Sequence, residues 1–76
     1  MTEEVFELRT EFIDLLQLLK ATGNAATGGD AKGAVDAGLV RVNGEPEERR
    51  RRKIREGDVV ELAGRIRISV VRAGDE

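Results

Sequence analysis

The sequence predicts a small α+β domain in which one strand is followed by two helices and then by four short strands. Two observations support this order. Apolar residues first alternate along the chain, then recur at helical spacing, and then alternate again. Helix stops and turn residues separate these stretches. The 76 residues, 1–76, are therefore expected to form a single domain.

The first strand and the first helix are expected before residue 24. Phe6 and Leu8 alternate with polar positions, which predicts a short strand. Asp14 precedes the apolar run 15–20 and is followed three positions later by a glutamine, a variant of the capping box. Gly23 is a natural C-terminal stop for this helix.

The second helix is expected to begin after Thr27, whose hydroxyl can cap the backbone N–H of Asp30. Ala31, Ala34 and Val35 then form a narrow apolar stripe at helical spacing. The small side chains of this stripe indicate close packing against the leucine-rich first helix. A glycine at position 38 ends the second helix.

The remaining strands are separated by recognisable turns. Residues 39–42 are followed by Asn43-Gly44, the strongest short-range signal for a hairpin. Pro46 restricts the returning strand to the edge of a sheet. Further strands are expected at 59–62 and 65–71. The expected core consists of Phe6, Leu8, Leu15, Leu18, Leu19, Val35, Val42, Ile54, Val60, Leu62, Ile66 and Ile68, and Phe12 is also expected to be buried.

The residue inventory disfavours an enzyme. The chain has no cysteine and no histidine, which removes thiolate metal sites and the commonest general base. Its one serine, Ser69, falls in a predicted strand. We therefore expect no cofactor, no metal and no small-molecule substrate. The acidic start and the lack of a long apolar run predict a cytoplasmic protein without a membrane partner.

The net charge of −2 conceals a gradient along the chain. Residues 1–19 carry five acids and one base, whereas residues 20–72 carry twelve bases and eight acids. The distribution of charge determines the field that a ligand meets. We expect the bases to form one positive face, with the acids of residues 1–14 lying elsewhere.

The run 49–55 holds six bases in seven positions. Arginine side chains match phosphate geometry with two parallel hydrogen bonds, so the run is a candidate site for a nucleic-acid backbone. The alternative is a solvated loop balanced by nearby glutamates: Glu45, Glu47, Glu48 and Glu56. With both phenylalanines expected in the core, no base-stacking platform is expected, which favours recognition of structured RNA by shape and backbone.

A second candidate lies at the start of the second helix. Gly28 and Gly29 allow close approach to the free N–H groups of a helix N-terminus, and Lys32 adds a charge one turn on. In the alternative interpretation, the glycines merely fit a tight turn between helices.

Residues 15–58 resemble the small RNA-binding domain named after ribosomal small-subunit protein four, in its free-standing bacterial form. The matching motifs are Leu-Leu-Lys at 18–20, Gly-Gly-Asp-Ala-Lys at 28–32, Gly-Leu-Val-Arg-Val-Asn-Gly-Glu at 38–45, and Arg-Arg-x-Arg-Lys-Ile-x-x-Gly-Asp at 49–58. The resemblance implies an αL RNA-binding motif, with its core at about 14–62. Two short packed helices would lie against a small bent antiparallel sheet of four to five strands.

The resemblance also implies where RNA binds, namely at the second helix, the following hairpin and the loop after it. The candidate residues are Gly29, Lys32, Arg41, Asn43, Arg49, Arg50, Arg52 and Lys53. The resulting hypothesis is a monomeric RNA-binding module for structured RNA, such as ribosomal RNA. The alternative is a protein-interaction module that docks an acidic partner.

Overall fold

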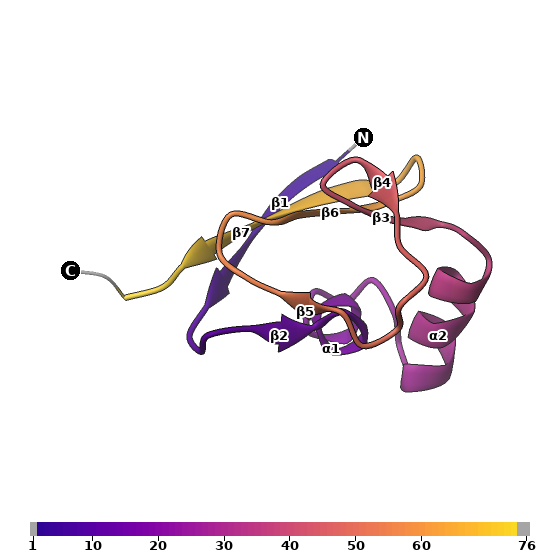
Figure 1. The fold of residues 1–76 in the computed structure, drawn as a ribbon, viewed down its shortest axis with the longest axis horizontal. Helices are drawn as coiled ribbons and strands as arrows, with labels where there is room; N and C mark the ends of the chain where they lie inside the picture. Colours follow the sequence, from indigo (N-terminus) through magenta and orange to yellow (C-terminus); the bar gives the residue numbers. More distant parts are fainter. Residues whose placement is uncertain (1, 75–76) are drawn as a thin grey trace.

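The computed structural model describes residues 2–74 and confirms the α+β class. The elements in chain order are β1 (Thr2–Leu8), β2 (Ile13–Asp14), α1 (Leu15–Ala21), α2 (Gly28–Asp36), β3 (Val40–Val42), β4 (Glu45–Pro46), β5 (Lys53–Ile54), β6 (Val59–Leu62) and β7 (Ile66–Arg72) (Figure 1). Within the described part of the chain, neither helix is long and apolar enough to cross a membrane.

Five strands form one sheet in the order β1-β7-β6-β3-β4, and β2 pairs with β5 in a separate two-stranded ribbon. The expectation of a wholly antiparallel sheet is wrong for one pair, because β1 runs parallel to β7. A parallel pair needs a long connection, and here both helices and five strands intervene. The other pairs of this sheet are antiparallel, and β4 lies at its edge as Pro46 predicts.

The helix boundaries follow the predicted capping signals. A side-chain oxygen of Asp14 accepts a hydrogen bond from the Gln17 N–H at 2.8 Å, and the Thr27 hydroxyl oxygen accepts one from the Asp30 N–H at 3.1 Å. Each bond satisfies a backbone donor that the first turn of a helix leaves free. Gly23 and Gly38 follow the helices with positive φ angles of 78° and 77°.

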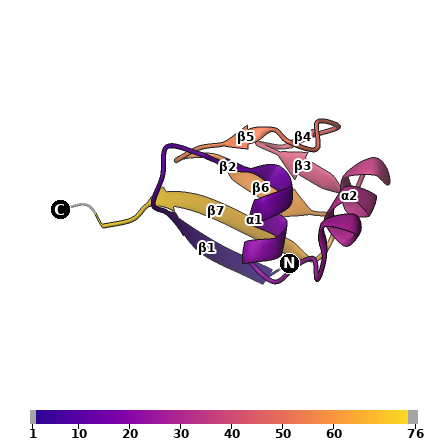
Figure 2. The same cartoon turned by 90° about the horizontal axis from the view of Figure 1, so that it is seen from below.

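The core lies between α1 and the five-stranded sheet, and Figure 2 shows α1 crossing one face of that sheet. All the predicted core residues are buried except Phe6, which packs against the core with part of its surface exposed. Ala31 of the predicted apolar stripe and Val70 are buried with them, and residues that were not predicted complete the core: Leu16, Ala25 and Val40. Phe12 contradicts its prediction, with 39% of its surface exposed, because it lies in the loop before β2, where no regular element turns it inward.

Replacement of Leu19 by alanine tests the packing of α1. Leu19 is 1% exposed, so Leu19→Ala should reduce the free energy of unfolding by about 2–5 kcal/mol. Leu39, which is 44% exposed, provides the control, and Leu39→Ala should change stability by about 0.5 kcal/mol or less. Urea denaturation measures both values. Equal stabilities of the two variants would contradict this arrangement of the core.

Candidate nucleic-acid interface

The loop between β4 and β5 folds around the carboxylate of Glu47, which is only 6% exposed. Arg49 donates to this carboxylate three times, from its backbone N–H at 2.9 Å, from Nε at 3.0 Å and from Nη2 at 3.2 Å. Arg52 donates from Nη1 at 2.7 Å. A buried charge needs such partners to offset its lost hydration. The side chains of Arg49 and Arg52 are therefore directed to Glu47.

These contacts fix the charge state of Glu47. The hydrogen bonds from the Arg49 side chain, helped by Arg52 and opposed by burial, lower the pKa of Glu47 from 4.5 to about 2. The same pairing raises the pKa of Arg49. Glu47 is thus ionised at neutral pH and acts as a permanent anion inside the arginine loop.

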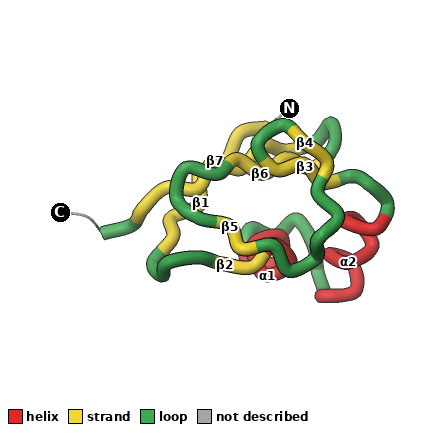
Figure 3. The backbone as a smooth tube through the Cα atoms, viewed as in Figure 1, coloured by secondary structure: helices red, strands yellow, loops and turns green. Residues whose placement is uncertain are grey.

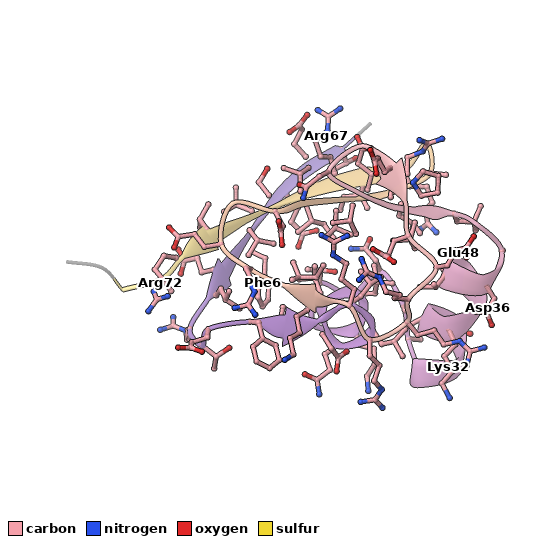
Figure 4. The ribbon with its side chains drawn as sticks, viewed as in Figure 1. Phe6, Lys32, Asp36, Glu48, Arg67 and Arg72 are labelled. Atoms are coloured by element: carbon pink, nitrogen blue, oxygen red, sulfur yellow. The ribbon has the colours of Figure 1, made fainter. Side chains whose placement is uncertain are left out.

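Arg50 connects the loop to α2 through Asp36. Its Nε and Nη2 atoms lie 3.0 Å and 2.7 Å from the two carboxylate oxygens, a bidentate pair. The hydrogen bond from Arg50 lowers the pKa of Asp36, with a smaller contribution from Lys32. Figure 4 shows Lys32 and Asp36 together on α2. Lys32 forms no ion pair within the part of the chain that the structure describes.

The backbone of the loop is anchored to α1. The carbonyl of Arg52 accepts a hydrogen bond from the Leu15 N–H at 2.9 Å, which satisfies a free donor in the first turn of the helix. The next residues form β5 and pair with β2. Figure 3 shows the loop running from β4 past α2 to β5. Both helices therefore hold the arginine loop in place.

Three cations near β5 lie on the outer side of this segment. Ile54 is fully buried, whereas its neighbours Lys53 and Arg55 are exposed. Arg51 is also exposed, with 78% of its side chain accessible and a loose contact of 3.7 Å from Nη1 to Asp14. We call Arg51, Lys53 and Arg55 the outer basic row. Among residues 2–74, Lys53 and Arg55 have no ion-pair partner within 4 Å.

The outer basic row also borders an aromatic ring. The Lys53 Nζ lies 4.8 Å from the centre of the Phe12 ring, and the Arg55 Cζ lies 5.7 Å from it. Arg51 and Arg55 belong to the basic run 49–55, but the candidate residues implied by the family resemblance included neither of them, and Phe12 was not a candidate at all. Two-residue alternation about the apolar Ile54 was a signal for the exposed positions 53 and 55, but nothing local marked Phe12 as exposed.

The side chains of Arg41 and Asn43 form hydrogen bonds at the turn of the β3–β4 hairpin. Arg41 donates from Nη1 to the Gly44 carbonyl at 3.2 Å and points away from the core, since Val40 and Val42 are its buried neighbours. Asn43 adopts a φ of 54°, accepts from the Val59 N–H at 2.9 Å and donates to Asp58 at 3.1 Å. The side chain of Asn43 thus ties the turn to β6.

Gly29 lies exposed in the first turn of α2. A Cβ atom added there would meet only the Thr27 hydroxyl oxygen at 3.7 Å, an ordinary contact distance. The packing of the described fold therefore does not require glycine at this position.

Acidic residues from the start of the chain are not wholly separate from the arginines. Asp14 lies opposite Lys53 in the β2–β5 ribbon and contacts Arg51, which contradicts the expectation for residues 1–14. Glu3 instead pairs with Arg67 at 2.7 Å, and Figure 4 shows Arg67 at the upper edge of the molecule, away from Lys32. Over residues 2–74, no cluster of three or more acidic side chains is placed to hold a metal ion.

The chain is similar to a known protein family and to a known bacterial protein. The family model described as the S4 domain matches residues 6–71. The chain is also 47% identical over 55 residues to the "Probable ribosome maturation protein RlbA" of Bacillus subtilis (strain 168). This alignment covers 72% of the present chain and 78% of that protein.

The Glu47 cluster should make stability depend on pH. Since the pKa of Glu47 is about 2 in the folded chain and ordinarily 4.5, its stabilisation is complete above about pH 5 and is lost as the pH falls toward about 2. Glu47→Gln should therefore cost about 1–3 kcal/mol at pH 7, and much less at about pH 2. Denaturant unfolding at both pH values measures the difference.

Glu48→Gln is the matched control, because Glu48 is exposed and has no ion-pair partner among the described residues. This variant should be as stable as the wild type at either pH. A Glu47→Gln penalty that is the same at pH 7 and at about pH 2 would rule out the assigned role of the Glu47 charge.

Proposed function

The chain belongs to the S4 domain family, and from this membership we propose that it is a module that binds structured RNA. The name of the Bacillus subtilis relative refers to ribosome maturation, which makes ribosomal RNA the proposed ligand. The protein would act as a monomer in the bacterial cytoplasm, by binding and without catalysis. Within the chain itself, the observation that carries the proposal is the outer basic row, whose cations remain accessible beside arginines that pair internally.

The proposed contacts divide by role. Arg51 and Lys53 bind phosphates directly, and Lys32 adds a further phosphate contact from α2. Arg50 also binds a phosphate, by releasing Asp36 and taking the phosphate as its new partner. This exchange costs little, because the pair with Asp36 is half exposed and such surface pairs are weak. Arg49 and Arg52 act mainly by shaping the loop.

The β3–β4 hairpin and the start of α2 supply the rest of the proposed interface. The Arg41 guanidinium has further N–H donors besides the one that bonds to the Gly44 carbonyl, and it contributes a phosphate contact from the hairpin. Asn43 contributes by fixing the turn. Gly29 admits a phosphate close to the backbone N–H groups of α2.

A protein-interaction module remains the second candidate. The net charge of −2 and the internal pairing of Arg49, Arg50 and Arg52 favour it, because both reduce attraction to a polyanion. The two functions differ in a measurable property. RNA binding that neutralises several phosphates weakens steeply and log-linearly with salt concentration.

The salt dependence of RNA affinity tests the outer basic row. The double variant Arg51→Ala, Lys53→Ala should flatten the slope of log affinity against log salt by about one to two units, at roughly 0.7–0.9 per lost phosphate contact. The charge-matched control is Arg67→Ala, Arg72→Ala, which changes β7 at a distance from α2 (Figure 4) and should leave the slope nearly unchanged. Equal slopes for the two folded variants would favour the protein-interaction module.

Two glycine substitutions in α2 test the approach of RNA to the helix start. A Cβ at Gly33 would meet no atom within 4 Å and one at Gly29 only an ordinary contact of 3.7 Å, so Gly29→Ala and Gly33→Ala should each stabilise the fold slightly, by about 0.5 kcal/mol. Only Gly29→Ala is expected to weaken RNA binding, because its methyl group obstructs the N–H groups at the helix start. Thermal unfolding and filter-binding assays measure the two effects, and indistinguishable RNA affinities would exclude the proposed phosphate contact at Gly29.

A further inference from the structure

Phe12 is an aromatic side chain placed at the surface of a domain that has only two aromatic residues. Phe6, the other one, packs against the core. Phe12 leaves 39% of its surface exposed to solvent, although burial of so large an apolar side chain would stabilise a small fold. The apolar ring is therefore available to a ligand.

The ring is held in a defined place. Phe12 directly precedes β2, and Ile13 and Asp14 of that strand pair with Ile54 and Lys53 of β5. Lys53 and Arg55 approach the ring at 4.8 Å and 5.7 Å from its centre, distances at which cations are attracted to an aromatic face. Such a preorganised ring loses little conformational freedom when a ligand stacks on it.

Aromatic rings bordered by lysine and arginine suit one class of ligand in particular. A nucleobase stacks on the ring, and the phosphates on either side of it contact the cations. Bases inside a duplex are covered by their neighbours, whereas an unpaired base can leave the helix and reach a protein surface. Arg51 extends the row of positive charge beyond Lys53 and provides for a further phosphate.

We propose that Phe12, Lys53 and Arg55 form a binding site for one unpaired nucleotide of the RNA. The base stacks on the exposed part of the Phe12 ring, and the adjoining phosphates bind Lys53 and Arg55. This inference rests on the proposed RNA-binding function. It adds base stacking to an interface for which the sequence indicated only backbone and shape recognition.

The test compares two blunt-ended RNA duplexes of the same sequence, of which one carries a single bulged uridine and the other is fully paired throughout. Both are titrated at low salt with the wild type, Phe12→Leu and Phe12→Tyr. Leucine keeps an apolar side chain over the same surface but has no π face, whereas tyrosine keeps the ring. Urea unfolding of each variant establishes that the fold is retained.

Phe12→Leu should weaken binding to the bulged RNA by about five- to a hundredfold and leave the affinity for the paired RNA unchanged. Phe12→Tyr should bind both RNAs as the wild type does. With 5-iodouridine at the bulge, long-wavelength irradiation should crosslink the base to the peptide that contains Phe12.

Other outcomes distinguish a failure of the stacking site from a failure of the proposed RNA-binding function. If the wild type binds both RNAs and Phe12→Leu weakens neither or both equally, RNA binding stands and the stacking site is excluded. A crosslink confined to other peptides would also exclude it. If the wild type binds neither RNA even at low salt, the proposed RNA-binding function fails as well.

Discussion

The buried carboxylate of Glu47 is the constraint on which the candidate interface depends. It accepts four hydrogen bonds from Arg49 and Arg52, so the loop must turn these residues toward it. Successive side chains of an extended backbone point to opposite faces. In the extended segment after the loop, Ile54 is buried, and its neighbours Lys53 and Arg55 are exposed to solvent. The buried anion at Glu47, two residues before the arginine run, thus decides which cations shape the loop and which face solvent.

The same loop couples the interface to both helices. Arg50 binds Asp36 on α2, and the carbonyl of Arg52 accepts from the first turn of α1. The positions of the phosphate-binding candidates therefore depend on how the helices pack, and a change in the core can move these side chains without replacing any of them. The internal pairs neutralise Glu47 and Asp36 together with their arginine partners, whereas Lys53 and Arg55 have no ion-pair partner among the described residues.

Three residues of the family motifs have structural roles in this chain besides any contact with RNA. Asn43 adopts a left-handed backbone conformation and bonds across to β6, while Arg49 and Arg52 neutralise Glu47. A residue that matches a binding motif can thus support the site by holding its backbone. Stability measurements beside binding measurements are needed to separate these contributions.

The sequence by itself determined the local structure of this protein and its family. Caps at Asp14 and Thr27, the Asn43-Gly44 turn and the alternation along β7 involve residues a few positions apart, so their physical causes are visible in the chain. Only the tertiary structure decided three other features: the parallel pairing of β1 with β7, the choice of Glu47 among four glutamates, and the exposure of Phe12. Each depends on contacts between distant segments and on which groups lose water, and no local pattern specifies these.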